Sequence, residues 1–402
     1  MNFKGKVNMG VIMCPGFKAA GVASGLKKKG QKDLGLIYSQ VPAAVAALFT
    51  KNRVKAAPVL LDMELIKSGV CQAIIVNSGN ANCCTGERGM RDAKTMTRLA
   101  ASELGISSDL VFVASTGVIG APLPIEKIKT SVHDLVESLQ PEGIHDLARS
   151  IMTTDTVPKI VSAQGVLEGK TFTVTGVAKG AGMIRPDMAT MLCFVCTDAG
   201  ASPDILKETL VKAADRSFNR ITIDGDTSTN DTVMIMANGL SGAVIQSAVH
   251  KNIFQKILDE IFLDLAKQLV KHGEGVTKLV EIKVRGAVSD SDARNIADTV
   301  AHSPLVKTSF FGEDANWGRI VGAVGRANAE IDPEKIDVYF DNVQMVKAGI
   351  GCGKAAEADA TKVLCKPEFV VTIDLNMGRG SDLMYTCDFS VDYVRINADY
   401  RS

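Results

Sequence analysis

Short apolar runs alternate along this chain with longer segments of helical period, and this alternation constrains the fold more than any other feature. Strand-like runs occur at residues 72–77 and 191–197, while helical period covers 204–217 and 253–271. Small residues are frequent and aromatic residues make up only 5%. This alternation predicts an α/β fold. At 402 residues, with 46% of them hydrophobic, the chain is long enough for two or three packed lobes.

The two helical segments carry start and stop signals. Ser202 is a candidate N-cap with Pro203 at the first helical position. The segment 253–271 has apolar residues at every fourth position and meets Gly273 just after its end, as expected of a helix C-terminus. Both segments are therefore predicted helices.

The pattern changes after this second helix. Residues 280–284 alternate in period two, and further strand-like runs follow at 338–340 and 369–373. We therefore expect a catalytic α/β region over residues 1–275, a smaller C-terminal α+β lobe over 276–380, and an ordered tail over 381–402 that returns to the active site.

Composition excludes several classes of protein. Forty-five basic residues balance 45 acidic ones, and the longest basic block is 27–29, so a nucleic-acid footprint is missing. No apolar run approaches the roughly 18 to 20 residues of a membrane span, which predicts a cytoplasmic protein. Nine cysteines fit reduced, mostly buried thiols. Cys193 and Cys196 have no second Cys/His pair at zinc-ligand spacing, so we expect no metal.

The most informative segment is residues 179–190, which runs directly into the strand-like run 191–197. Gly180, Gly182 and Pro186 predict an unusual turn just before Thr190. Such a turn can place the Thr190 hydroxyl against the carbonyl of Ala189, so that an N-to-O acyl shift and ester hydrolysis would cut the chain. The new α-amino group, with a reference pKa of about 7.7 to 8.0, can then act as a base for the hydroxyl. The alternative is an ordinary glycine-rich loop.

Other catalytic patterns lack their parts. The five histidines form no H-E-x-x-H, no G-x-S-x-G occurs, and neither glycine-rich run completes a nucleotide fingerprint. The acidic cluster at 224–231 fails as an EF-hand, because Thr229 and Ile235 stand where Gly and Glu are needed. These residues would instead cap a helix or order a loop near the active site.

Seven motifs in order give the chain a resemblance to the ornithine acetyltransferase family, often called ArgJ, over nearly its whole length. They are NSGNAN at 77–82 with TGERG at 85–89, STGVIG at 115–120, MTTDT at 152–156, KGAGMIRPDMATML at 179–192, FNRITIDGDTSTND at 218–231, GEG at 273–275 with TK at 277–278, and INADYRS at 396–402.

This resemblance implies a layered α/β sandwich of the ornithine acetyltransferase/aminopeptidase type with an N-terminal threonine nucleophile. Self-cleavage before Thr190 would give an α chain, 1–189, and a β chain, 190–402, assembled as α2β2. The acetyl group of N-acetylornithine would pass to Thr190 and then to glutamate, with no cofactor. Some members also accept acetyl-CoA. An aminopeptidase or amidase of the same fold, which gives the acyl group to water, is the alternative.

The resemblance also assigns roles by position. Thr116 and Gly117 would form the oxyanion hole, one by its hydroxyl and the other by its backbone N–H. A lysine suits a substrate carboxylate and a glutamate suits an amino group. Ala181, Arg185 and Asp187 depart from the residues common in the family, which bears on the cleavage rate. The substrate-contacting positions are Thr153, Lys179, Thr190, Glu274, Asn397 and Ser402.

Overall fold

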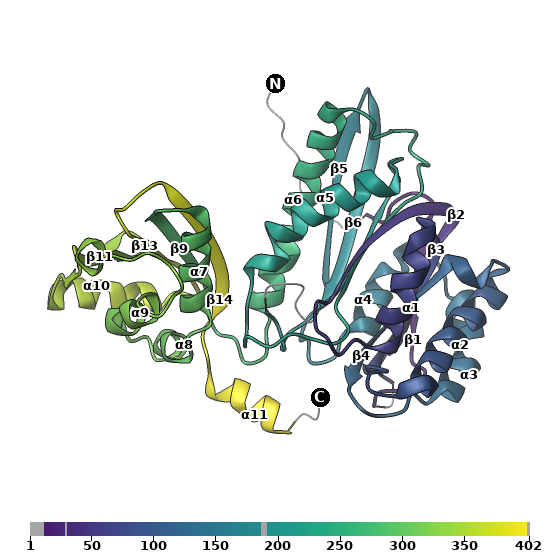
Figure 1. Cartoon of the computed structure of the whole chain (residues 1–402). Helices are drawn as coiled ribbons and strands as arrows, with labels where there is room; N and C mark the ends of the chain where they lie inside the picture. The colour runs from purple at the N-terminus through teal and green to yellow at the C-terminus, as the bar shows by residue number, and fades with distance from the viewer. Residues whose placement is uncertain (1–11, 29, 186–190, 400–402) are drawn as a thin grey trace.

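The computed structural model describes residues 12–28, 30–185 and 191–399. Strands and helices alternate through these residues and form two sheets, each with its own helices (Figure 1). The predicted α/β fold is confirmed.

The first sheet is mixed, in the order β4-β3-β2-β8-β7-β6-β5, with β1 paired to β2. The pairs β3–β4 and β7–β8 are parallel and the other pairs are antiparallel. Its strands are β1 (Phe17–Val22), β2 (Leu34–Phe49), β3 (Val70–Asn80), β4 (Val111–Val118), β5 (Lys159–Leu167), β6 (Lys170–Lys179), β7 (Leu192–Thr197) and β8 (Thr232–Ala237).

Both faces of this sheet are covered, which explains why β7 is apolar throughout. Cys193 and Val195 pack in a core with helices α5 and α6, whereas Phe194 and Cys196 pack in a core with α4 on the other face. Because side chains alternate across a strand, Cys193 and Cys196 point to opposite faces. They therefore do not form a common ligand pair.

Helices α1, α2 and α3 pack in a further core with β2, β3 and β4. The helices are α1 (Ala57–Leu65), α2 (Gly86–Leu104), α3 (Ile125–Glu137), α4 (Ile144–Ile151), α5 (Pro203–Asp215), α6 (Ala248–Lys271), α7 (Asp290–Ala301), α8 (Pro304–Phe311), α9 (Trp317–Val324), α10 (Lys354–Leu364) and α11 (Val391–Asp399). Short 3₁₀ turns lie at Ile66–Ser68, Ser108–Leu110, Pro141–Gly143, Phe218–Arg220 and Pro333–Lys335.

Helices α5 and α6 confirm the two helical predictions, and their caps set their limits. The Ser202 side chain accepts a hydrogen bond from the Ile205 backbone N–H, as an N-cap does. Helix α6 begins five residues earlier than its apolar period suggested, because Ser247 caps it by accepting from the His250 N–H. The apolar stripe of α6 is buried, with the Phe218 and Phe262 rings 4.9 Å apart.

The second sheet has the order β12-β11-β10-β13-β9-β14, and its core is separate from those of the first sheet. Helices α7 to α10 accompany it (Figure 1). Helix α11 leaves this sheet after β14 and lies beneath the junction of the two lobes (Figure 1). The strands are β9 (Leu279–Ala287), β10 (Asp337–Phe340), β11 (Val343–Lys347), β12 (Ile350–Gly351), β13 (Glu368–Asp374) and β14 (Gly380–Cys387).

Candidate active site

A pocket of about 210 Å³ opens where the ends of β4 and β6 meet the segment after α6 and helix α11. Six of the eight predicted catalytic and substrate-contacting residues line it, although they come from segments far apart in the chain. Two others, Thr190 and Ser402, lie outside the described residues, as does the Ala189–Thr190 bond. The six are Thr116, Gly117, Thr153, Lys179, Glu274 and Asn397.

Thr116 and Gly117 lie at the end of β4, paired with β3. Gly117 has φ +132°, and a Cβ there would lie 2.4 Å from the Gly79 carbonyl carbon, so only glycine fits. Asn230 braces this corner, because its side-chain amide donates to the Ser115 and Ala81 carbonyls at 2.8 and 2.7 Å. The two predicted oxyanion donors therefore sit on a fixed backbone.

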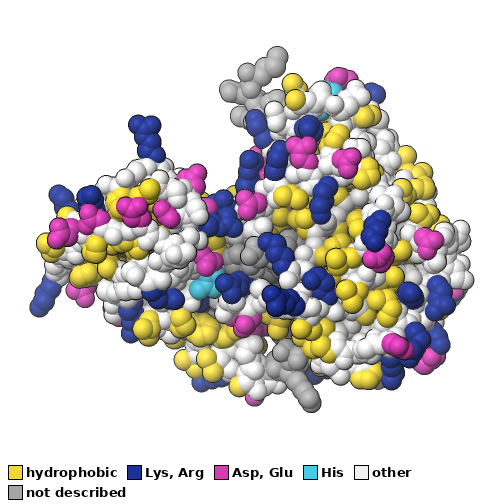
Figure 2. Space-filling model, in the orientation of Figure 1, with side chains coloured by type: hydrophobic (Ala, Val, Ile, Leu, Met, Phe, Trp, Pro, Cys, Tyr) yellow, Lys and Arg dark blue, Asp and Glu magenta, His cyan; other side chains and the backbone are white. Residues whose placement is uncertain are grey.

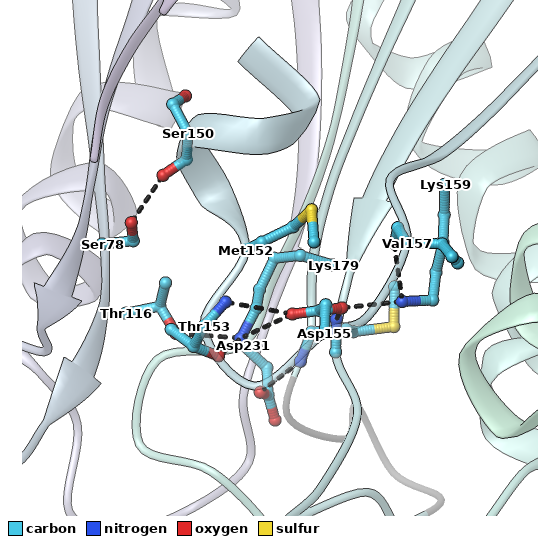
Figure 3. Close-up of polar contacts among 12 residues, drawn as sticks. Ser78, Thr116, Ser150, Met152, Thr153, Asp155, Val157, Lys159, Lys179 and Asp231 are labelled. Atoms are coloured by element: carbon cyan, nitrogen blue, oxygen red, sulfur yellow. Dashed lines mark hydrogen bonds and ion pairs between the residues drawn. The ribbon is translucent and has the colours of Figure 1, made fainter. Parts of the chain in front are cut away.

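Lys179 ends β6 and is only 3% exposed. Its ammonium donates to the hydroxyl of Thr153 at 2.8 Å and to the hydroxyl of Thr116 at 3.3 Å (Figure 3). We call Thr116, Thr153 and Lys179 the basic wall of the pocket. From the sequence alone Lys179 could be read as a surface charge. The structure shows that it is a buried cation.

Asp155 lies behind the basic wall with no exposed side-chain area. It accepts from the Lys159 ammonium and the Gly180 backbone N–H, both at 2.7 Å, and from the Thr153 N–H at 3.1 Å (Figure 3). The Lys179 ammonium lies 3.9 Å from Asp155 Oδ2, the oxygen that accepts from the Thr153 N–H. Burial raises the pKa of Asp155, but Lys179, Lys159 and the Gly180 N–H outweigh burial and bring it to about 2. Asp155 is therefore a buried carboxylate.

Two buried ammonium groups thus share one carboxylate. Burial lowers the pKa of Lys179, Asp155 opposes this effect and Lys159 adds to it. The balance leaves the back of the basic wall with more positive than negative charge, which favours an anion or a partial negative charge in the pocket.

Glu274 lies opposite, just beyond the end of α6, and is 8% exposed. Its backbone N–H donates to the Ala181 carbonyl at 2.8 Å. Its carboxylate lies so close to Gly182 that a Cβ there would be 2.4 Å from an Oε atom. The fold therefore holds this buried carboxylate against the turn that follows Lys179.

Helix α11 completes the same side. The Asn397 amide donates to the Glu274 carboxylate at 2.8 Å. One turn earlier, the Tyr393 hydroxyl donates to the Asp224 carboxylate at 3.1 Å. We call Glu274 and Asn397 the acidic wall of the pocket.

Asp224 and Asp231 hold the described backbone on either side of residues 186–190. Asp224 accepts from the N–H groups of Met183 and Ile184 at 2.6 and 2.9 Å, and Asp231 accepts from Met191 at 2.9 Å. Of the two roles left open for the acidic cluster, these contacts favour ordering a loop beside the pocket. Burial raises the pKa of both aspartates above its usual value.

Sequence reasoning did not assign roles to Asp155, Lys159, Tyr393 or Asn230. One local signal was present: Lys159 opens an otherwise half-apolar strand four residues after Asp155, a pattern that suggests a buried pair. Tyr393 and Asn230 had no local signal, because their partners lie more than 100 residues away.

No cluster of three metal-ligating side chains occurs in residues 12–28, 30–185 and 191–399. Over the same residues, no helix combines the length and apolar character that crossing a bilayer requires. On the face in Figure 2, basic and acidic side chains are interspersed.

An α/β sheet with a small pocket that sets a buried ammonium and hydroxyls opposite a carboxylate defines an enzyme site for a small polar molecule. The ArgJ family model matches residues 18–402. The chain belongs to the ArgJ family, and the family predicted from the motifs is confirmed.

Relatives match over almost the whole chain. It is similar to the arginine biosynthesis bifunctional protein ArgJ of Geobacter sulfurreducens, 53% identical over 96% of this chain and 99% of that protein. The protein of the same name from Syntrophotalea carbinolica is 50% identical over 98% and 100%. A solved chain of ornithine acetyltransferase complexed with ornithine, from Mycobacterium tuberculosis, is 39% identical, with TM-score 0.41 over 44% of this chain and 94% of that chain.

Proposed function

We propose that this chain is an ornithine acetyltransferase that moves the acetyl group of N-acetylornithine to glutamate through an acetyl-Thr190 intermediate. The observation that carries the proposal is the meeting of the basic and acidic walls in one pocket. Both amino acids present carboxylate and ammonium groups, which suit a buried lysine and a buried glutamate respectively. The enzyme is cytoplasmic and needs no cofactor.

Maturation begins with cleavage of the Ala189–Thr190 bond. The Thr190 hydroxyl attacks the Ala189 carbonyl carbon, the acyl group moves from nitrogen to oxygen, and water hydrolyses the resulting ester. Asp224 and Asp231 support this step, because they fix the described backbone before and after the bond. The products are an α chain of residues 1–189 and a β chain that begins with Thr190, in an α2β2 assembly.

In the first half-reaction the Thr190 hydroxyl attacks the acetyl carbonyl carbon and gives its proton to the Thr190 α-amino group. The carbonyl oxygen becomes an oxyanion, which the Thr116 hydroxyl and the Gly117 N–H stabilise. When the C–N bond breaks, the leaving amine takes that proton and ornithine departs. In the second half-reaction the glutamate amine attacks the ester and regenerates the Thr190 hydroxyl.

We infer a second activity, for which the names of the relatives give support. Their description as bifunctional supports acetyl-CoA as an additional acetyl donor, which would make N-acetylglutamate directly from glutamate. Purified protein incubated with glutamate and acetyl-CoA tests this activity by release of free CoA thiol.

An amidase of the same fold would pass the acetyl group to water. Ornithine release from N-acetylornithine, measured with and without glutamate, separates the two reactions. We expect release to depend on glutamate and N-acetylglutamate to accumulate in equal amount. Equal release in both conditions would exclude the transferase.

Cleavage has its own test. A denaturing gel of the mature protein should show two bands in place of one at 42.6 kDa, and Thr190→Ala should give a single intact band. A single intact band from fully active wild-type protein would contradict the N-terminal nucleophile.

A further inference from the structure

The hydrogen bonds of Lys179 fix which way the Thr116 hydroxyl donates. An ammonium group has three N–H donors and no acceptor, whereas a hydroxyl has one donor and two acceptor lone pairs. The 3.3 Å contact between the Lys179 nitrogen and the Thr116 oxygen therefore runs from lysine to threonine. The Thr116 oxygen is the acceptor, and its own hydrogen stays available for another partner.

Thr116 lines the pocket and is 6% exposed. It donates to no acceptor among the described residues in any hydrogen bond of the structure. A hydroxyl that accepts from a cation is polarised and becomes a better donor, since hydrogen bonds in a chain strengthen one another. The available hydrogen therefore suits an oxygen that gains negative charge in the pocket.

Asp155 holds Lys179 in the position from which its ammonium donates to Thr116. Its two oxygens tie the backbone N–H of Gly180, the residue after Lys179, to that of Thr153, whose hydroxyl accepts from the same ammonium. Among the described residues, Asp155 is also the nearest opposite charge to Lys179, at 3.9 Å. Both the position and the charge of the ammonium thus depend on this buried carboxylate.

We propose that Lys179, held by Asp155, is a positioning residue that orients and polarises the Thr116 hydroxyl as an oxyanion donor. This inference rests on the proposed function, because it needs Thr116 to act on the oxyanion. It gives Lys179 a role beyond contact with the substrate, and it gives Asp155 a part in the reaction. Within the described residues the Lys179 ammonium donates to two hydroxyls, those of Thr116 and Thr153, so one N–H is left that can meet a substrate carboxylate.

Burial and several charged groups around the pocket affect the protonation of Lys179. Burial disfavours the ammonium most strongly and lowers the pKa of Lys179. Asp155 favours the ammonium, Lys159 disfavours it, and Glu274 and Asp231 favour it. Lys27, whose ammonium donates to the Met152 carbonyl at 2.8 Å, adds a further positive charge nearby. Loss of the Lys179 proton would let the lysine accept from Thr116, so the proposed donor would turn away from the pocket.

A double-mutant cycle tests the inference with N-acetylornithine and glutamate as substrates. Each rate is divided by the fraction of the protein that has been cleaved at Thr190, as measured on a denaturing gel. We expect Thr116→Ala to lower kcat by roughly 100-fold, and Lys179→Met to lower it by about tenfold or more when Thr116 is present. In the Thr116→Ala background, Lys179→Met should change kcat little, because it has no hydroxyl to act through.

Thr116→Ser is the matched control. It keeps the hydroxyl, so the effect of Lys179→Met on kcat should return. If Thr116→Ala lowers kcat and the Lys179 effect simply multiplies with it, the inference is wrong while the proposed function stands. If Thr116→Ala leaves kcat unchanged, the oxyanion assignment in the proposed function fails first.

A pH profile gives an independent readout that does not need a Lys179 variant. The rate should fall at alkaline pH as Lys179 loses its proton. Asp155→Asn removes a charge that favours the ammonium and should move this fall to lower pH, whereas Lys159→Met should move it to higher pH. Shifts of opposite sign support the inference, and equal profiles for both variants and wild type would overturn it.

Discussion

Thr116 and Lys179 of the basic wall are buried, whereas the acidic wall is completed by a helix at the surface. Lys179, Asp155 and Lys159 are buried in the first lobe, close to the ends of β5 and β6. Asn397, by contrast, is exposed, and α11 has no buried residue. The helix is held by a few polar contacts, such as that of Ser390 with the Gly275 carbonyl.

This difference indicates how each wall works. The basic wall has its charges and hydrogen bonds in place before any substrate arrives, which is the arrangement that stabilises developing charge most effectively. The acidic wall depends on the docking of one helix, so its contribution can change with little cost to the rest of the fold. We therefore expect changes in the basic wall to affect stability and rate, and changes in the acidic wall to affect substrate binding.

The largest effect should come from Asp155→Asn. This substitution leaves two buried ammonium groups facing a neutral amide, and breaking a buried pair costs about 3 to 5 kcal/mol. We expect the free energy of unfolding, measured in urea, to fall by this amount. Glu368→Gln is the control, because its ion pair with Lys271 is half exposed and should be worth less than about 1 kcal/mol. Equal losses would refute the contrast between the walls.

The second largest effect should be the loss, in acid, of the stability that the Asp155 carboxylate contributes behind the basic wall. The folded pKa of Asp155, about 2, lies below that of an unfolded aspartate, so its stabilising contribution is complete above about pH 4. The contribution is lost as pH falls toward 2 and amounts to about 2 kcal/mol. The difference in unfolding free energy between wild type and Asp155→Asn should therefore shrink over this range. A constant difference would show that the ionised carboxylate adds no stability.

In the acidic wall, Glu274→Gln keeps the shape and the contact with Asn397 but removes the charge. We expect KM for N-acetylornithine to rise about tenfold, as loss of a charge-assisted hydrogen bond implies, with little change in the unfolding free energy. Glu208→Gln, on the surface of α5, serves as the control and should leave KM unchanged. A large loss of stability in Glu274→Gln would place Glu274 among the structural residues.

The smallest effect should come from Tyr393→Phe, which removes only the hydroxyl that meets Asp224. One such hydrogen bond is worth about 1 kcal/mol, or roughly a fivefold rise in KM. Amide hydrogen exchange in α11 should quicken by a similar factor. Unchanged exchange would mean that other contacts suffice to hold the helix.

The sequence predicted those parts of the molecule that have local signals. The Ser202 cap and the apolar period of α6 were sufficient for two helices, because caps and periodicity are properties of neighbouring residues. The pocket residues Thr116, Lys179 and Glu274 came from the family motifs. Their roles, and the domain limits, remain predictions.

Other features depend on partners that no local pattern encodes. Asp155 has a partner nearby in the chain, Lys159, but its bond to Gly180 joins residues 25 positions apart. The bond of Tyr393 with Asp224 spans 169 positions. The burial of Lys179 also depends on the three-dimensional fold, because a lysine at the end of a strand next to glycine usually faces water.

The contact between Tyr393 and Asp224 also has a consequence for the order in which the protein is made. At about 5 to 20 residues per second, the ribosome adds Tyr393 roughly 10 to 30 seconds after Asp224. The first sheet and its basic wall can fold during this interval, while the second sheet is still being synthesised. The acidic wall is then completed last, so a nascent chain would have both walls of the substrate pocket only near the end of translation.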